Sequence, residues 1–283
     1  MLKKISQAFL ILALTMSCKQ DAVHQFKQEI KPNKTYIKQL TNSTNSVVNF
    51  IADQETLDLI ESNGYKLPIK TEIISKMNMD IITKNKDEKG EFLAEKQYGE
   101  INTSFTINGK TNIEQKPYSG MRILGKYDSA NKFFIDSIVG IQLLPQMKYF
   151  HNVIIENMQS KIKFPQNGIK IGDTIKNEMP LDIPVQGMSP VKALIKMQYV
   201  FQAIKGEKAI FKLIPKAQLD TKWGQENTQL SGTGIGTSEF DLKENYLTSH
   251  SYVLPLELTI IVNDEMTAKI KITMKSEQSV SIK

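Results

Sequence analysis

The sequence predicts a mainly β fold of half-barrel type: long, curled antiparallel sheet with one amphipathic helix packed against it. Alternating apolar and polar residues predict the strands, most clearly over 191–203, where every odd position is apolar. Turn signals separate such stretches, and Asn108-Gly109 is a strong hairpin signal. One segment, Gln146–Ser160, instead repeats apolar residues at helical spacing.

The chain begins with a stretch typical of a secretory signal. Two lysines precede an apolar run, Ile5–Met16, and the small residue Ser17 precedes the only cysteine, Cys18. The run is shorter than the roughly 20 apolar residues that span a bilayer. Its end, Leu14–Cys18, resembles a bacterial lipobox, which implies that residues 1–17 are removed and that Cys18 is acylated. Cleavage elsewhere, leaving a free thiol, is the alternative.

Residues 18–33 are expected to form a flexible, lipidated tether, because the stretch after Cys18 is polar and shows no periodicity. This polar leader resembles that of outer-membrane and surface lipoproteins of the Bacteroidota. The resemblance implies an exported protein, anchored to the outer membrane at its periplasmic face or on the cell surface. An acylated Cys18 leaves no cysteine for a disulfide, so stability must come from burial and sheet hydrogen bonds.

The charge balance argues against a nucleic-acid partner. The chain has 36 basic and 30 acidic residues, and Arg122 is its only arginine. Sequence-specific readers of nucleic acid commonly use arginine for bidentate contacts with bases. No basic cluster is interleaved with aromatic residues, so the lysines are interpreted as the polar faces of strands.

Residues 34–144 are expected to form a first β unit. Asp53 is a candidate N-cap for a short helix that ends at Asn63-Gly64, and an irregular loop is the alternative there. A seven-residue turn without apolar side chains, 84–90, is expected to reverse the chain. The predicted strands of this unit are 35–40 and 46–51 around a polar turn at 42–45, then 69–81, 92–98, 101–107, 112–115, 120–126 and 133–139.

Residues 145–168 are expected to contain the amphipathic helix and a connector, and residues 169–283 a second β unit. Thirteen residues of strand, 191–203, would extend over about 43 Å, which requires a strongly twisted, curled sheet. The other predicted strands of the second unit are 210–214, 252–262 and 266–275.

The two units resemble one another in sequence. Lys76–Ile81 recurs as Lys196–Phe201, and each copy is followed by a charged turn that contains a glycine, Gly90 or Gly206. This order of features predicts a duplication. The alternative is that any two long hairpins look alike.

Motifs for catalysis and metal binding are missing from the sequence. Three scattered histidines, His24, His151 and His250, have no partner at metal-ligand spacing and are interpreted as structural or surface residues. The glycine-rich stretch 232–236 lacks the last glycine of a phosphate-binding loop and is expected to hold turn or bulge glycines. Trp223 is a candidate for stacking on a sugar, with a core or rim position as the alternative. We expect no enzyme activity, no metal and no cofactor.

Two functions remain. The lipobox, the long alternating strands and the helix are similar to lipoprotein carriers built as half-barrels, and the turn Pro165–Thr174 resembles one in uncharacterised Bacteroidota lipoproteins. The similarity implies a membrane-tethered protein that binds a hydrophobic or lipid-like ligand in a curled β-sheet cavity; no ligand-binding residue is assigned. The alternative is an interaction module that binds an envelope protein or a glycan. Methionines, which adapt to irregular apolar ligands, are frequent on the predicted apolar faces: Met77, Met79, Met147, Met158, Met197, Met266 and Met274.

Overall fold

The structure is a computed structural model that describes residues 22–116, 118–140, 162–183, 185, 190–220, 222 and 226–283. Cys18, the predicted helix Gln146–Ser160, His151 and Trp223 lie outside these residues. Among the described residues, one large antiparallel sheet of 13 strands dominates the fold. This confirms the predicted fold class as a mainly β chain with one curled antiparallel sheet, while the helix predicted to pack against the sheet is not described.

The strands follow one another around the sheet as a meander. Their bounds are β1 (Thr35–Ile51), β2 (Ile69–Thr83), β3 (Phe92–Ile107), β4 (Lys110–Gln115), β5 (Arg122–Tyr127), β6 (Phe133–Val139), β7 (Thr174–Ile183), β8 (Val191–Lys205), β9 (Lys208–Leu219), β10 (Thr228–Thr233), β11 (Ile235–Asp241), β12 (Tyr246–Ile261) and β13 (Thr267–Ile282). The order across the sheet is β6-β5-β3-β2-β1-β13-β12-β10-β9-β8-β7, with β4 beside β3 and β11 between β12 and β9.

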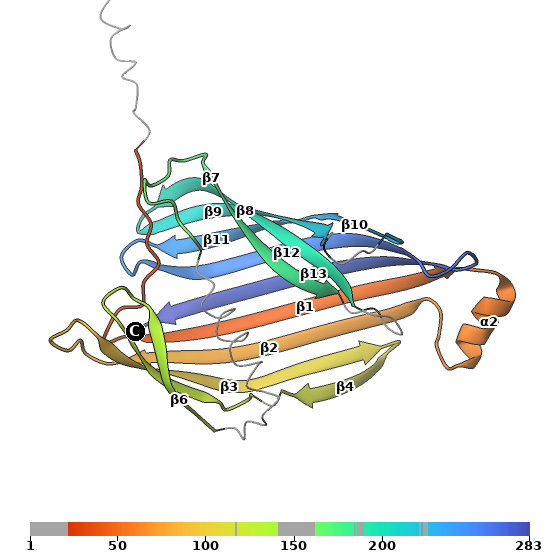
Figure 1. The fold of residues 1–283 in the computed structure, drawn as a ribbon, viewed down its shortest axis with the longest axis horizontal. Coiled ribbons are helices and arrows are strands. Elements are labelled where there is room, and N and C mark those ends of the chain that lie inside the picture. The colour runs from red at the N-terminus through yellow and green to blue at the C-terminus, as the bar shows by residue number, and fades with distance from the viewer. Residues whose placement is uncertain are drawn as a thin grey trace, which may run out of the picture.

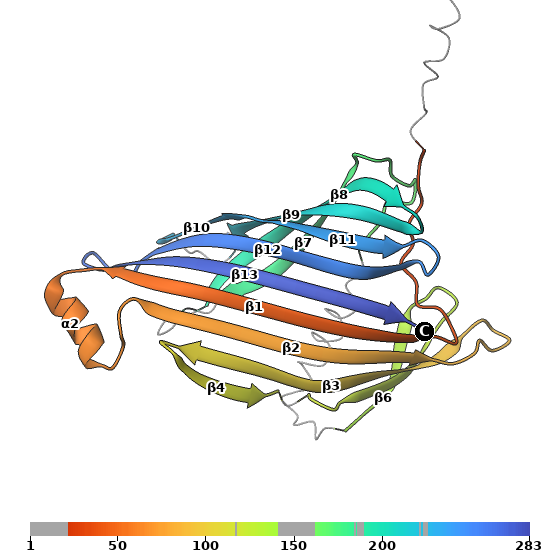
Figure 2. The same ribbon diagram turned by 180° about the vertical axis from the view of Figure 1, so that it is seen from behind.

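The first and last strands of the meander pair at the centre of the sheet. β1 and β13 run antiparallel from Tyr36 opposite Ile282 to Ile51 opposite Thr267, without a break in register. The edges are therefore β6 and β7, on either side of the connection between the two halves of the chain. The sheet curls so that both edges come forward in Figure 1, and β1, β13 and β12 lie in front when it is seen from behind in Figure 2.

Both halves of the sheet have the same strand plan. In the first half β3 pairs with two successive short strands, β4 and β5, and in the second half β9 pairs with β10 and β11. The turns after β5 and β11 each contain an asparagine with positive φ, Asn131 at 62° and Asn245 at 53°. The sequence similarity between 76–81 and 196–201 thus falls on β2 and β8, which occupy equivalent places in this plan. The two predicted units nevertheless share a single continuous sheet.

The buried side chains form two clusters. The larger one lies mostly on the second half and includes Val48 of β1, and the smaller one contains Tyr36, Met79, Ile123 and Tyr127 of the first half. In β8 the inward positions are apolar along nearly the whole strand, which is why its alternation predicted it so clearly.

Two strand predictions need correction. β1 is one strand, not two strands around a turn at 42–45, because Asn42 to Asn45 pair with β13 on one side and β2 on the other. β3 likewise joins the predicted strands 92–98 and 101–107. Its two parts continue through Gly99, where the register with β2 shifts between Met77 and Met79. β7 and β10 were not predicted, whereas a short strand was expected after Ser231-Gly232, where β11 lies.

Glycines 232, 234 and 236 lie in and between β10 and β11, not in a phosphate-binding loop. A Cβ on Gly236 would come within 2.1 Å of the Ser251 carbonyl oxygen, and one on Gly234 within 2.2 Å of the Val253 oxygen. Only glycine allows the backbones to approach so closely. The pairing of β12 with β10 and β11 is interrupted here, at Pro255, which has no N–H to donate, whereas its pairing with β13 continues.

The short helix predicted after Asp53 is confirmed as α2 (Gln54–Ser62). The Asp53 carboxylate accepts a 2.7 Å hydrogen bond from the Thr56 N–H, as an N-cap does. The helix buries none of its residues and projects from one end of the sheet (Figure 1). In the described part of the chain, no helix combines the length and apolar character needed to cross a bilayer.

Residues 22–34, which we name the strap, correct the prediction of a flexible tether. The strap crosses the end of the sheet opposite α2 (Figure 1). Its Phe26 and Ile30 are buried, one in each of the two core clusters. The burial of these two residues could not be predicted from the sequence. The strap is neither helix nor strand, so its apolar residues have no regular spacing, and most of their neighbours are polar.

Candidate functional site

A cavity of about 490 Å³ lies between the two core clusters and is the candidate functional site. It is lined by the strap, by strands of both halves of the sheet and by the turn between β5 and β6. Small-molecule pockets in proteins have volumes of about 300–1,000 Å³. Its apolar lining includes Ile30, Met79, Ile81, Phe133, Ile162, Met179 and Leu247, and its polar lining includes Lys38, Lys96, Tyr199, His250, Tyr252, Ser276 and Gln278.

The central strands supply the polar part of this lining. Successive side chains of a strand alternate between its two faces, so Lys38 shares the inward face of β1 with the fully buried Tyr36. On β13, Ser276 and Gln278 share their face with the buried Val280. Around the cavity, inward-facing positions therefore carry polar side chains, where a fully packed core would have apolar ones.

Lys38 carries an enclosed amine. Its direct neighbours across the sheet are Met79 on β2 and Val280 on β13, both buried and apolar. Burial lowers the pKa of the Lys38 amine below its usual value, because the charged form loses hydration. Within the described part of the chain, no carboxylate forms an ion pair with Lys38.

His250 lies opposite Gln278 on β12 and also faces the cavity. Burial, and secondly the positive charge of Lys38, lower the pKa of the His250 imidazole to about 4. The ring is therefore neutral at pH 7. Its Nδ1 is buried and has no hydrogen-bond partner among the residues that the structure describes. The rings of Tyr199 and Tyr252 lie beside it, with centroids 6.1 Å and 5.6 Å away.

Lys96 is a second enclosed lysine, with 5% of its surface exposed. Its Nζ lies 3.8 Å from the centroid of the Phe133 ring and 5.8 Å from that of Tyr127. The faces of aromatic rings attract cations, so these rings offset part of the cost of burying the ammonium group.

Tyrosine hydroxyls complete the polar lining. Burial raises the pKa of Tyr199 and of Tyr246 to about 12, so both phenols stay neutral and can donate hydrogen bonds. Burial also raises the pKa of Tyr252, and a hydrogen bond with Ser276 lowers it in part. The site therefore offers neutral donors and lysine ammonium groups beside apolar surface.

The strap closes one end of the cavity and is bonded to both halves of the sheet. Asn131, in the turn after β5, receives a 2.9 Å hydrogen bond from the Ile30 N–H and returns a 2.6 Å bond from its amide to the Ile30 oxygen. The Glu29 N–H donates to the oxygen of Asn245, in the equivalent turn after β11. Further along the chain, the Lys31 N–H donates to the Tyr36 hydroxyl at 2.8 Å. The strap is thus fixed between two equivalent turns.

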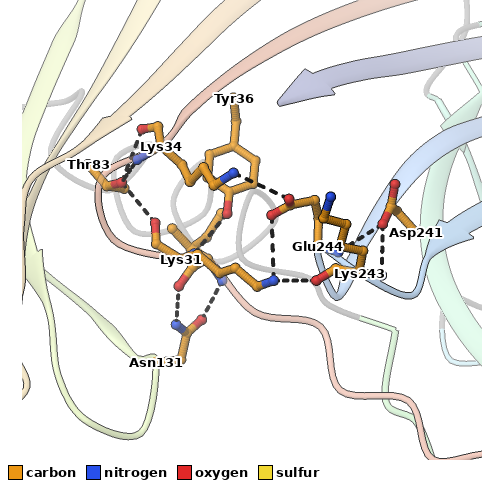
Figure 3. A network of polar contacts seen from close by, with 9 residues as sticks. Lys31, Lys34, Tyr36, Thr83, Asn131, Asp241, Lys243 and Glu244 are labelled. Carbon is orange, nitrogen blue, oxygen red and sulfur yellow. Dashed lines mark hydrogen bonds and ion pairs between the residues drawn. The ribbon is translucent and has the colours of Figure 1, made fainter. Parts of the chain in front are cut away.

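Figure 3 shows the charged part of this network. The Glu244 carboxylate lies 3.5 Å from Lys31 Nζ and 3.3 Å from Lys34 Nζ, and its side chain is 15% exposed. The hydroxyl of Thr83 on β2 donates to the Lys31 oxygen at 2.8 Å. These contacts connect the end of the strap to β2 and to the turn after β11.

Few residues singled out in the sequence lie at this site. His250 and Met79 line it, whereas His24 is in the strap, with its ring nearly perpendicular to that of Phe201. Met197 is fully buried in the larger core cluster. Within the described residues, no group of three or more His, Cys, Asp or Glu side chains is placed to hold a metal ion.

Sequence reasoning missed Lys38, Lys96 and the tyrosines of the site. Lys38 differs from the many solvent-facing lysines only in its parity: it lies an even number of residues from Tyr36. Both residues lie in the predicted strand 35–40, but each face of that strand mixes apolar and polar side chains, so alternation does not show which face points inward.

No family model and no curated protein matches the chain. Solved structures show only distant similarity. A structure entitled "Lipid-protein interactions in lipovitellin" is 11% identical with a TM-score of 0.45; the match covers 90% of this chain and 26% of that one. The translocator domain of the autotransporter NalP from Neisseria meningitidis is 6% identical, with a TM-score of 0.20 and coverage of 97% and 95%. Pseudomonas aeruginosa OccK7 is 5% identical, with a TM-score of 0.21 and coverage of 88% and 99%.

The chain thus spans about a quarter of the lipovitellin chain that it matches. The similarity is to lipid-binding and outer-membrane β proteins, at scores that establish neither a shared fold nor a shared function. The cavity is therefore the feature from which a function is inferred.

Proposed function

We propose that the protein binds a lipid-like amphiphile in the cavity of its curled sheet, without catalysis, while an acylated Cys18 anchors it to the outer membrane. The cavity is the observation that carries the proposal: about 490 Å³ of space lined by apolar side chains and by a few polar groups. Pockets of this size and mixed lining are typical of small-molecule sites.

The lining favours an amphiphile over a purely apolar molecule. Ile30, Met79, Ile81 and Phe133 offer apolar surface to a chain. Lys38, on the same face of the sheet, would lose hydration against an apolar ligand without gaining a partner, and such a loss is costly. A ligand with one polar end satisfies both parts of the lining.

Native mass spectrometry tests the binding. The full chain is expressed in a bacterium, extracted from membranes with digitonin, which has no alkyl chain, and analysed with and without lipid extraction. We expect a bound amphiphile in near-stoichiometric amount. A protein that carries no ligand, and takes up none when lipids are added, would refute the proposal and favour the alternative, an interaction module for an envelope protein or glycan.

A cavity-filling substitution makes the test specific. Met179→Trp places a large side chain at the wall formed by β7, and we expect the bound species to be lost. Leu93→Trp, on a side chain that is 60% exposed on β3, is the matched control and should retain the ligand. Equal loading of the two variants would place the ligand elsewhere.

The proposed anchor is tested separately. In cells, Cys18→Ser should move the protein from the membrane fraction to the soluble fraction, because acylation requires the thiol. An unchanged membrane fraction in that variant would refute lipidation at Cys18 and leave the cavity proposal standing.

A further inference from the structure

We infer that the amphiphile bound in the cavity is an anion, with one negatively charged headgroup seated on Lys38 and an apolar chain lying against the first half of the sheet. This inference rests on the proposed function and specifies its ligand class. The relevant chemistry is that of an alkyl chain ending in an oxyanion, either a carboxylate or a phosphate.

The charges around the cavity favour an anion. Of the described lining residues, Lys38, Lys96 and Lys132 carry amines, and Glu29 is the carboxylate. Glu29 is already ion-paired with Lys27 in the strap. The cavity therefore has an excess of positive charge before a ligand enters.

Among the described residues, Lys38 is the member of this set with neither a counter-charge nor an aromatic ring against its amine. Lys132 is exposed, and its Nζ lies 5.1 Å from the Phe134 ring centroid. Lys96 is held against the Phe133 ring. Lys38 has apolar Met79 and Val280 directly opposite it on its two neighbouring strands. An enclosed amine in such surroundings is stabilised in its charged form when an anion binds beside it.

Neighbouring groups can complete a headgroup site. His250 lies near enough for the charge of Lys38 to affect it, and its buried Nδ1 lacks a partner. As the Nδ1–H tautomer, the imidazole donates a hydrogen bond to an oxyanion. Gln278, which lies opposite His250 on β13, supplies an amide donor on the same wall of the cavity. An ammonium group with neutral donors around it is well suited to one small oxyanion.

The lining also indicates where the alkyl chain of the ligand would lie. From Lys38 toward β2 the lining is Met79 and Ile81, followed by Phe133 and by Ile30 of the strap. These residues are buried members of the smaller core cluster. The headgroup thus lies over the central strands, and the chain extends toward β6 beneath the strap.

Ligand binding by the delipidated full chain tests the inference. The probes are palmitate, hexadecanol and palmitoyl lysophosphatidate, which differ in headgroup and share the alkyl chain. We expect the two anions to bind the native protein more tightly than hexadecanol. In Lys38→Met, binding of the anions should weaken roughly ten- to a hundredfold, as for the loss of one charge-assisted hydrogen bond, and binding of hexadecanol should not weaken.

The control variant is Lys76→Met, which removes an exposed lysine of β2. It should leave binding of all three probes unchanged. The stability of the ligand-free variants distinguishes a binding role of Lys38 from a role in holding the fold. If Lys38 serves binding, Lys38→Met should be at least as stable as the native chain, because it removes a buried charge without a partner. If Lys38 held the fold, the variant would be less stable.

The outcomes separate the two proposals. If the native protein binds none of the probes, the proposed function fails. If it binds all three equally, and Lys38→Met weakens none of them, the ligand class inferred here is wrong and the lipid site stands. Lys38-dependent binding of only one anion would support the inference and identify the headgroup as carboxylate or phosphate.

Discussion

His250 should make the protein lose stability as the pH falls below neutrality. Its pKa is about 4 in the folded state, against 6.5 for a free imidazole, because burial and Lys38 disfavour its charged form. The unfolded chain therefore binds a proton between pH 6.5 and 4 that the folded chain does not. By linkage, the free energy of unfolding decreases as the pH falls through this window and becomes level below it.

The two pKa values set the size of the effect. One pKa unit corresponds to about 1.36 kcal/mol, so a change from 6.5 to about 4 amounts to roughly 3 kcal/mol over the whole window. A typical domain has a total stability of about 5–15 kcal/mol, so a loss of this size is easily measured.

Urea unfolding at several pH values between 7 and 4 provides the assay, with delipidated native protein and His250→Gln followed by circular dichroism. Carboxylates titrate in both proteins, so the difference between their two curves isolates the imidazole. The native protein should lose about 3 kcal/mol more than the variant between pH 7 and 4. Parallel curves would show that His250 is not enclosed as described, and would remove the neutral donor from the headgroup site.

Three further predictions concern the strap and the sheet. Phe26→Ala should destabilise the protein by about 3–5 kcal/mol, because Phe26 is 6% exposed and packs edge-to-face on three rings of the larger core cluster; amide exchange in the strap should accelerate. Tyr36→Phe should cost about 1–3 kcal/mol in urea unfolding, because the Lys31 N–H loses its acceptor. Gly236→Ala should cost about 1–3 kcal/mol and lower Tm, because the new methyl group would overlap the Ser251 oxygen.

Matched substitutions serve as controls for these three. Val23→Ala removes an exposed strap side chain, Tyr65→Phe an exposed hydroxyl and Ser231→Ala a solvent-facing hydroxyl of β10. Each should leave the free energy of unfolding nearly unchanged. A strap that exchanges its amides equally fast in the native chain and in Phe26→Ala would contradict the anchoring described for Phe26.

The sequence predicted strands best where the inward side chains are uniformly apolar. β8 is such a strand, and its bounds were predicted within two residues. β1 was divided in two because Asn42 to Asn45 has the composition of a turn. Its extended form comes from pairing on both sides, with partners in β2 and in β13, and sequence periodicity carries no information on such partners.

The residues of the site could not be predicted from alternation either. A cavity needs polar groups at positions that alternation assigns to the core, so alternation fails at those positions. Lys38 in β1 and Gln278 in β13 are examples. The strap was missed because its bonds go to Asn131 and Asn245, more than a hundred residues further along the chain. The curl of the sheet was predicted, but the polar residues that line its cavity were not.

The pairing of β1 with β13 also constrains how the protein folds. Tyr36 and Ile282 are partners, so the centre of the sheet is completed only when a strand from each end of the described chain is present. Contacts between residues so distant in sequence slow folding, because the chain loses the entropy of closing a long loop before the stabilising contacts form. Until then one edge of β1 is an open row of backbone donors and acceptors, which other chains can pair with. During synthesis, we therefore expect the emerging chain to depend on a chaperone that covers β1 until β13 arrives.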